Sequence, residues 1–271
     1  MIGRRIKVSR SLAYGEGTRR TLDVYWRGGA GPAPVILFFY GGSWQGGSKR
    51  LYRFVGTALA RRGYVAVVAD YRTYPEVRFP GFIEDGALAL RWTKDHAMRF
   101  GGDPHRIFLM GHSAGAHIAA MLALDGQWLN DIGLDNRRDI AGLIGIAGPY
   151  DFLPLRDGVL KTIFSGNDPR TQPISHVSHG APPALLVTGA HDNIVDPGNS
   201  ARLAAKLESS SNEAKVITYP RVRHLSIMVA FLPLLRFLAP LMRDIDAFVA
   251  RTTLAAGGNR LRGVELMEAH Q

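Results

Sequence analysis

The stretch Ile107-Phe108-Leu109-Met110-Gly111-His112-Ser113-Ala114-Gly115 joins a predicted strand to a predicted helix. Residues 107–110 form a continuous apolar run, which is typical of a strand covered on both faces. The helix is expected to begin at Ala114 and to continue to Leu124. The turn between them consists mainly of small residues, which allow a tight change of chain direction. The sequence therefore predicts a strand–turn–helix unit with Ser113 at its turn.

Apolar runs of strand length recur on both sides of this unit, and segments of helical character separate them. The further predicted strands cover residues 35–39, 64–69, 143–146, 184–187 and 215–219, and the further predicted helices cover residues 51–62, 82–99 and 197–209. Residues 6–8 and 21–25 alternate apolar with polar residues, which suits antiparallel strands at a sheet edge. Because strands separated by helices require right-handed crossovers, we predict a doubly wound, mostly parallel sheet of about eight strands with helices on both faces.

Composition and length agree with a single α/β domain spanning residues 1–271. The chain of 271 residues is 46% hydrophobic and 21% charged, as expected for a soluble globular protein with an extensive core. It contains no internal repeat, low-complexity tract or linker. In a sheet of this kind, functional sites form at the carboxyl ends of the strands. Functional side chains are therefore expected at that edge.

The chain carries a formal net charge of +10 and contains no cysteine. Positive charge attracts nucleic acid or an anionic membrane surface. The arginines are scattered, however, and no basic run is interleaved with aromatic residues. A solvated basic surface is therefore expected, and nucleic acid is not expected as a partner. The lack of cysteine excludes disulfides, thiolate catalysis and Cys-ligated zinc.

Neither the amino terminus nor the most apolar segment predicts a membrane-inserted protein. The basic amino terminus is not followed by an apolar run of signal-peptide length, so we expect a cytoplasmic protein, and a secreted one stays open. Residues 227–242 are shorter than the roughly 20 residues of a membrane span, and two prolines and an arginine interrupt them. We expect a buried or cleft-lining helical segment there. A homodimer is compatible with the sequence.

Ser113 is the candidate nucleophile. The Gly-x-Ser-x-Gly pattern from Gly111 to Gly115 comes directly after a predicted strand and opens a predicted helix. This context indicates a nucleophile elbow, in which the serine lies on a tight, strained turn. The helix amino terminus also provides N–H groups and a positive dipole for a developing oxyanion. A glycine-rich turn with an incidental serine is the alternative.

Tyr40-Gly41-Gly42-Ser43-Trp44 follows the predicted strand over residues 35–39 directly. A glycine pair at the carboxyl end of this strand lets the backbone turn its N–H groups toward the nucleophile. We predict an oxyanion hole formed by the N–H of Ala114 and the N–H of Gly42 or Ser43. The alternative is an ordinary glycine turn.

Three segments resemble known hydrolases over a region from about Leu22 to Phe248. Residues 40–44 are similar to the His-Gly-Gly-x-Trp loop of the esterase and arylformamidase group of α/β-hydrolases. Residues 111–120, GHSAGAHIAA, resemble the elbow of kynurenine formamidases and of related carboxylesterases, including feruloyl-esterase-like ones. Residues 70–80, with DYR, PE and FP, resemble a segment of hormone-sensitive-lipase-like esterases. The resemblance implies the α/β-hydrolase fold.

Tyr40 departs from the pattern of these families, which usually carry histidine at this position. In the families that histidine braces the oxyanion loop and does not transfer protons. A tyrosine hydroxyl can form a hydrogen bond in a similar way. The departure therefore concerns the geometry of the loop rather than the class of reaction.

The candidate base is His224, and two aspartates are candidates for the acid. The order in these hydrolases is serine, acid, histidine, and His224 follows the predicted strand over residues 215–219 by a short loop. Asp192 and Asp196 both follow the strand over residues 184–187. The pattern Gly-x-x-Asp-x-x-Val resembles the acid loop of the family and selects Asp192. Asp196 has an alternative role as a cap of the next predicted helix.

Further residues near these motifs are expected to contact the substrate or to support the site. Trp44 and His112 are expected to contact the substrate, although Trp44 could instead pack beneath the loop. Arg72 and Glu76 are expected to form a structural polar network near the site. The apolar residues from Leu225 to Leu232 are candidates for contacts with the acyl group. No metal-ligand spacing or phosphate-binding glycine pattern is found, so no cofactor is expected.

These observations predict a serine carboxylic ester hydrolase that works through an acyl-enzyme. Ser113 attacks, His224 acts as base and then as acid, and Asp192 orients His224. Residues 148–180 are too few for a full lid, so we expect little or no cap and a preference for small to medium acyl esters. An arylformamidase that cleaves N-formylkynurenine is one alternative, because the elbow resembles those enzymes. A non-catalytic binding protein with the hydrolase fold is the other.

Overall fold

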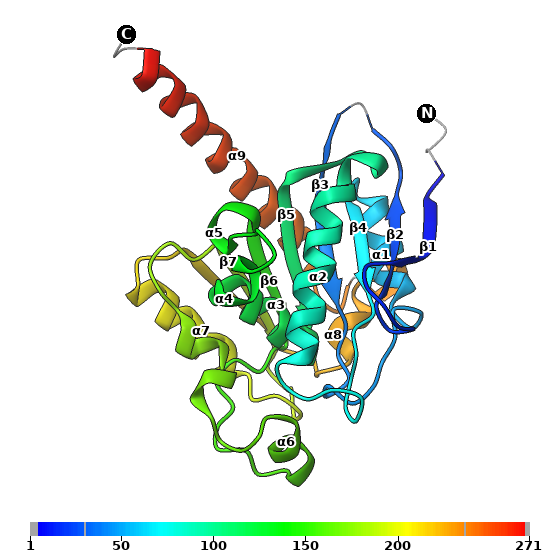
Figure 1. The fold of residues 1–271 in the computed structure, drawn as a ribbon, viewed down its shortest axis with the longest axis vertical. Helices are drawn as coiled ribbons and strands as arrows, with labels where there is room; N and C mark the ends of the chain where they lie inside the picture. Colours follow the sequence, from blue (N-terminus) through cyan, green and yellow to red (C-terminus); the bar gives the residue numbers. More distant parts are fainter. Residues whose placement is uncertain (1–4, 30, 236, 269–271) are drawn as a thin grey trace.

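The computed structural model describes residues 5–29, 31–235 and 237–268, with side chains described as far as Ala255. Its strands form one eight-stranded sheet in the order β1-β2-β4-β3-β5-β6-β7-β8 (Figure 1). The strands are β1 (Lys7–Ala13), β2 (Thr21–Trp26), β3 (Ala33–Phe39), β4 (Val65–Ala69), β5 (Gly102–His112), β6 (Gly142–Ile146), β7 (Ala184–Gly189) and β8 (Ala214–Tyr219). β1 and β2 pair antiparallel, β2 and β4 also pair antiparallel, and the remaining pairs are parallel. The predicted mostly parallel sheet with an antiparallel edge is confirmed.

Helices cover both faces of the sheet, as predicted. α2 and α3 pack on one face, and α1 and the first part of α9 lie on the other (Figure 1). The longer helices are α1 (Arg53–Arg61), α2 (Gly81–His96), α3 (Ala114–Leu124), α7 (Gly198–Ser209) and α9 (Leu241–Glu268). The shorter ones are α4 (Gln127–Asn130), α5 (Asn136–Asp139), α6 (Gly158–Ile163) and α8 (Ser226–Val229), and the 3-10 turns are η1 (Ala97–Phe100), η2 (Pro169–Thr171), η3 (Pro173–His176) and η4 (Pro233–Leu235).

The apolar runs of the central strands are fully buried, which explains why their sequences do not alternate with polar residues. In β3 the side chains from Val35 to Phe39 are fully buried, and in β5 those from Ile107 to Met110 are too. Layers of helix on both sides leave such strands no polar face, so alternation disappears from their sequences. The same packing brings the carboxyl ends of β3, β5, β7 and β8 to one edge of the sheet.

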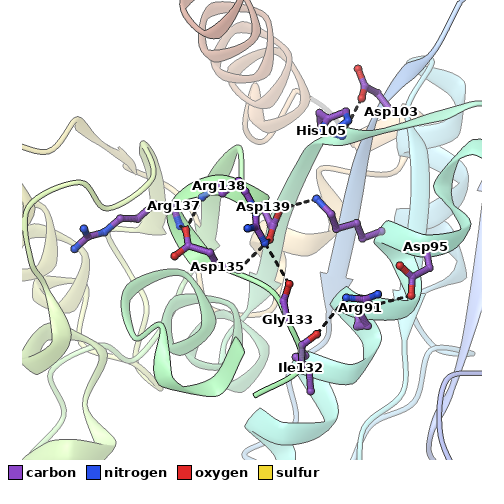
Figure 2. Close-up of polar contacts among 11 residues, drawn as sticks. Arg91, Asp95, Asp103, His105, Ile132, Gly133, Asp135, Arg137, Arg138 and Asp139 are labelled. Carbon is purple, nitrogen blue, oxygen red and sulfur yellow. Dashed lines mark hydrogen bonds and ion pairs between the residues drawn. The ribbon is translucent and has the colours of Figure 1, made fainter. Parts of the chain in front are cut away.

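A polar network at the other edge of the sheet joins α5 to α2 (Figure 2). Asp135 caps α5 by accepting the N–H groups of Arg137 and Arg138 at 2.9 and 2.8 Å. The buried carboxylate of Asp139 accepts hydrogen bonds from Arg138 at 2.7 Å and from Lys94 of α2 at 2.5 Å. Burial opposes ionisation, but these hydrogen bonds hold the pKa of Asp139 below its ordinary value. This network is structural and lies away from the edge that carries the site.

The segment over residues 227–242 differs from the helical segment predicted for it. It consists of the last residues of α8, the short turn η4 and the first two residues of α9. Ile227 and Phe231 are fully buried, whereas Leu234 is 88% exposed and Phe237 is 79% exposed. Prolines cannot donate to a helix backbone, so they divide the segment into turns. Among the described residues, no helix combines the length and the apolar character needed to cross a membrane.

Candidate active site

Ser113 lies at the turn between β5 and α3, with a φ of 55° and a ψ of −123°. A positive φ at a residue other than glycine is strained and persists only where the surroundings impose it. Here the Ser113 N–H donates to the carbonyl oxygen of Ile146 in β6 at 2.9 Å. The start of α3 holds the other side of the turn. The serine side chain is thereby aimed away from the sheet at its carboxyl edge.

Two glycines allow the chain to close this turn. A Cβ atom at Gly111 would lie 2.1 Å from the carbonyl oxygen of Gly115. A Cβ atom at Gly115 would lie 2.1 Å from the carbonyl oxygen of Phe39 in β3. Such approaches exclude any side chain at either position. The Gly-x-Ser-x-Gly pattern therefore reflects close backbone packing in the elbow.

The side chains of Ser113, His224 and Asp192 form one chain of hydrogen bonds. His224 Nε2 lies 2.9 Å from Ser113 Oγ, and His224 Nδ1 lies 2.8 Å from Asp192 Oδ2. A carboxylate can only accept, so the proton belongs on Nδ1, and Nε2 is free to accept the hydroxyl proton. The other oxygen of Asp192 accepts the N–H groups of Ile194 and Val195 at 2.9 Å each. Two backbone N–H groups thus hold the carboxylate that orients the imidazole.

Asp196, the alternative acid, is engaged elsewhere. Its Oδ1 accepts the N–H of Gly198 at the start of α7 at 2.9 Å, and its Oδ2 pairs with Arg202 at 3.0 Å. The hydrogen bond from the Gly198 N–H, together with Arg202, lowers the pKa of Asp196. Its side chain is 63% exposed, whereas that of Asp192 is fully buried. The structure therefore brings Asp192, and not Asp196, to His224.

The predicted oxyanion loop packs directly against the nucleophile. A Cβ atom at Gly41 would lie 2.9 Å from the Cβ atom of Ser113, so the loop backbone touches the serine. The next residues turn sharply, because Gly42 has a φ of 146° and Ser43 a φ of 53°. Ser43 and Ser113 line the same pocket, and Ala114 is the first residue of α3. The N–H groups of Gly42, Ser43 and Ala114 remain the predicted oxyanion donors.

His112 does not lie where substrate would contact it, which corrects the prediction. Its side chain is buried, and its Nε2 donates to the backbone carbonyl of His224 at 3.1 Å. Burial, and then the neighbouring His224, lower its pKa to about 3, so it is neutral near pH 7. The described residues that line the pocket do not include it. His112 is the last residue of β5, and its side chain points into the protein interior rather than into the pocket.

A pocket of about 500 Å³ opens beside Ser113. One wall is the chain that follows β6, between residues 149 and 160, and the opposite wall belongs to residues 194–202. Its lining residues are Ser43, Trp44, Ser113, Pro149, Asp151, Phe152, Leu153, Pro154, Leu155, Arg156, Asp157, Leu160, Ile194, Val195, Asp196, Asn199 and Arg202. The sequence identified this stretch only by its length, because its apolar residues follow no strand or helix period.

Trp44 lines the pocket and is also packed among aromatic rings, and its contact with the substrate stays a prediction. It is only 4% exposed. Its ring stacks on Phe152 at 5.8 Å and meets the edges of Phe164 and His117 at 4.8 and 5.2 Å. Aromatic contacts of this kind fix the position of the indole. Trp44 therefore joins the oxyanion loop to the wall of the pocket.

The apolar residues after His224 do not form the pocket, contrary to the prediction. Ile227 and Phe231 are fully buried in the core, and Leu225 is 65% exposed to solvent. Residues 225–232 are all described, and none of them belongs to the pocket lining. Phe231 packs against Phe54, with ring centroids 6.5 Å apart.

Arg72 belongs to a structural polar network, as predicted, but its hydrogen-bond partner there is Asp85 rather than Glu76. The guanidinium of Arg72 binds Asp85 of α2, with Nη2 at 2.8 Å from Oδ1 and Nε at 2.9 Å from Oδ2. Arg20 from the segment before β2 joins the same carboxylate at 2.8 Å. Glu76 is exposed. Because Asp85 is predicted on a helix, its sequence position gave no sign that it would face Arg72.

Asn199 is a site residue that sequence reasoning missed. Its side-chain oxygen accepts the N–H groups of Tyr150 and Asp151 at 2.8 Å each. Arg202, one turn further along α7, pairs with Asp151 at 2.6 Å. These contacts join the two walls of the pocket. Within the described residues, no three His, Asp or Glu side chains are placed so that they could hold a metal ion.

Comparison with curated proteins finds esterases that are longer than this chain. The probable isoprenylcysteine alpha-carbonyl methylesterase ICMEL1 of Arabidopsis thaliana is 30% identical over an alignment of 247 positions that covers 82% of this chain and 52% of that protein. Esterase LipC of Mycobacterium tuberculosis is 29% identical over an alignment of 229 positions that covers 77% of this chain and 57% of that protein. The chain thus spans about half the length of these relatives.

Solved esterase structures superpose on most of this chain, and a family model matches a large part of its sequence. A truncated carbohydrate esterase from gut microbiota superposes with a TM-score of 0.79 at 18% identity, over 94% of this chain and 99% of that one. Thermogutta terrifontis esterase 2, phosphoramylated by tabun, superposes with a TM-score of 0.69 at 25% identity, over 90% and 96%. The family model BD-FAE matches residues 22–207. The chain has the α/β-hydrolase fold of the esterase group and belongs to the BD-FAE family.

Proposed function

We propose that this chain is a serine carboxylic ester hydrolase whose catalytic residues are Ser113, His224 and Asp192. The observation that carries the proposal is the hydrogen-bonded chain from Ser113 Oγ through His224 to Asp192, at 2.9 and 2.8 Å, beside a pocket. Both relatives described above are named as esterases. The nucleophile of such an enzyme needs an adjacent base and a third group that orients the base.

In the acylation step His224 Nε2 takes the proton of Ser113 as Oγ attacks the ester carbonyl carbon. The C=O electrons move onto the oxygen, and Asp192 stabilises the imidazolium that has formed. His224 then gives the proton to the departing alkoxide, which leaves as an alcohol. A water molecule repeats the sequence on the acyl-enzyme and releases the acid. No other group is required to balance these steps.

The oxyanion is assigned to backbone donors. The proposed donors are the N–H of Ala114, the first residue of α3, and the N–H of Gly42 or Ser43, whose neighbour Gly41 packs against Ser113. Each such donor lowers the barrier by about 3 kcal/mol, because it stabilises charge that develops only in the transition state. The helix dipole of α3 acts in the same direction.

Small to medium acyl esters are the proposed substrates. The pocket of about 500 Å³ is lined by Trp44, Phe152 and several aliphatic side chains, which suits a compact apolar group. Thermogutta terrifontis esterase 2, at 25% identity, is known in a propionate-bound structure. The chain after β6 contributes residues 149–160 to the wall of this pocket.

A fluorophosphonate probe tests the proposal directly. The probe should label the wild-type protein and the variant Ser209→Ala, in which an exposed serine of α7 is changed, and it should not label Ser113→Ala. Hydrolysis of p-nitrophenyl acetate and butyrate should follow the same pattern. An unlabelled wild-type protein would overturn the proposal. Faster turnover of N-formylkynurenine than of any ester would identify an arylformamidase instead.

A further inference from the structure

The carboxylate of Asp70 binds both ends of residues 41–48, a segment that contains the predicted oxyanion donors Gly42 and Ser43 and is called the oxyanion loop from here on. Asp70 directly follows β4, and Tyr40 directly follows the neighbouring parallel strand β3. The Tyr40 hydroxyl donates to Asp70 Oδ1 at 2.9 Å. The backbone N–H of Lys49 donates to the same oxygen at 2.6 Å, and Lys49 Nζ donates to Oδ2 at 2.8 Å. One carboxylate therefore binds the residue before the loop and the residue after it.

We propose that Asp70 is a positioning residue that sets the geometry of the oxyanion loop, residues 41–48, by holding Tyr40 and Lys49 at its two ends. The inference rests on the proposed function, because the loop amides matter only if they stabilise an oxyanion. It assigns a role to Asp70, and to the tyrosine that replaces the usual histidine of related families.

The network is buried and its polar groups have partners. Tyr40 is fully buried, and Asp70 and Lys49 are each 9% exposed. Lys49 Nζ also donates to the hydroxyl of Thr21 at 2.7 Å, and the Tyr71 hydroxyl donates to the carbonyl of Tyr40 at 2.7 Å. A buried ion pair contributes little net stability, because desolvation offsets the attraction. Satisfied networks of this kind do fix geometry, which is the role assigned to this one.

The loop is packed so that a change at its ends reaches the nucleophile. Gly47, with a φ of 102°, lies on the ring of Tyr40, where a Cβ atom would be 2.6 Å from Cε2. At the other side of the loop, Gly41 touches Ser113. The ring of Tyr40 is itself held between Tyr52 and Tyr71, with centroids 5.5 and 4.8 Å away. The loop therefore packs against the stacked ring of Tyr40 at one end and against Ser113 at the other.

Two variants test the contribution of the Tyr40 hydroxyl and that of the Asp70 carboxylate separately. Tyr40→Phe keeps the stacked ring and removes only the hydrogen bond, and Asp70→Asn removes the charge. Tyr64→Phe is the matched control, because the Tyr64 hydroxyl donates to the carboxylate of Asp246 at 2.8 Å in a pair far from the site. The measurements are kcat and KM for p-nitrophenyl butyrate, with the active serine counted by fluorophosphonate labelling. The affinity for a trifluoromethyl ketone, which forms an oxyanion adduct with Ser113, is the second measurement.

We expect kcat per labelled serine to fall about tenfold in Tyr40→Phe and about 100-fold in Asp70→Asn, since misplacing an oxyanion donor costs up to that much. KM should change less than twofold, and affinity for the ketone should fall in step with kcat/KM. Tyr64→Phe should match the wild type in both measurements. A merely structural role would lower the unfolding temperature and leave kcat per labelled serine unchanged.

The positioning role is overturned if Tyr40→Phe keeps kcat and ketone affinity within twofold of the wild type. This variant decides the matter alone if Asp70→Asn does not fold. A wild-type protein that the fluorophosphonate does not label overturns the proposed function and the positioning role together. A labelled, active wild type with unchanged variants overturns only the positioning role.

Discussion

His112 donates its Nε2 hydrogen to the backbone carbonyl of His224 at 3.1 Å, so the residue before the nucleophile supports the loop that carries the base. The two imidazole rings lie 4.9 Å apart. Among the described residues, no partner meets His112 Nδ1, although that nitrogen is buried. The geometry requires a neutral His112 with its proton on Nε2. Two hydrogen bonds therefore join the elbow to His224: one from Ser113 to the imidazole, and one from His112 to the backbone carbonyl.

Replacing His112 with phenylalanine should weaken both stability and turnover. His112→Phe replaces the imidazole with a somewhat larger apolar ring and leaves the buried carbonyl of His224 without its donor, and the lost donor costs about 1–3 kcal/mol of the free energy of unfolding. The His224 loop then loses its tether, so kcat should fall while KM changes little. Urea denaturation and steady-state kinetics measure the two effects. A variant with wild-type kcat would show that the loop is held without His112.

Stability should decline as the pH falls below about 6.5. Burial lowers the pKa of His112 to about 3 and that of His117 to about 4, whereas both groups titrate near 6.5 in the unfolded chain. Between these values the unfolded state binds more protons than the folded state, so stability is fully present above pH 6.5 and is lost as the pH falls toward 3–4. Thermal unfolding from pH 7 to pH 4 checks this.

The control for this pH dependence removes one titrating group at a time. In His117→Phe, the slope of unfolding free energy against pH should become shallower between pH 4 and 6. His105→Ala changes an exposed histidine and should keep the wild-type slope. An unchanged slope in His117→Phe would mean that His117 protonates as easily in the folded protein as in the unfolded chain.

Asp192 and Asp196 should differ strongly when each is changed to asparagine. Asp192→Asn can no longer hold the required tautomer of His224, and losses of about 10⁴-fold in kcat are typical of such a change. Asp196→Asn should change kcat less than threefold, because that carboxylate serves Gly198 and Arg202 at the start of α7. Steady-state kinetics on the two purified variants decides between them. A larger loss in Asp196→Asn would reverse the assignment.

The fold and the elbow could be predicted because their physical causes are local. A strand buried on both faces needs a continuous apolar run, and β3, β5 and β6 show it directly in their sequences. The elbow needs glycine at positions 111 and 115, since each Cβ would meet a carbonyl oxygen. The order of Ser113, Asp192 and His224 follows from the order of the strands.

The pocket could not be predicted, because its walls arise from contacts that are distant in the sequence. Phe152 lines the same pocket as Ser113, and Asn199 and Arg202 of α7 bind the chain just before it. The partner of Arg72 was missed for the same reason, since Asp85 lies on a different element. His112 was misassigned because proximity to Ser113 in sequence does not give the direction of a side chain in a turn.

Gly115→Ala should disrupt the elbow although it adds a single methyl group. The new Cβ would lie 2.1 Å from the carbonyl oxygen of Phe39, a distance that only a shift of β3 or α3 can relieve. Overpacking of this kind costs about 1–3 kcal/mol or more. Gly31→Ala, where no atom lies within 4 Å of the added Cβ, is the control. Differential scanning fluorimetry should show a lower unfolding temperature for Gly115→Ala alone.

The acyl group of the substrate is expected to bind on the side of Ser113 where Trp44 and Phe152 lie. Phe152 stacks on Trp44 and lines the pocket, whereas Leu225 is 65% exposed and lies outside the lining. Phe152→Ala should enlarge the pocket and raise the ratio of kcat/KM for p-nitrophenyl octanoate to that for the acetate by about tenfold, since each added methylene that finds room contributes about 1 kcal/mol. Leu225→Ala should leave this ratio within twofold. If Leu225→Ala changed the ratio and Phe152→Ala did not, the acyl group would bind beside the chain that follows His224. Residues 149–160 would then have a structural role only.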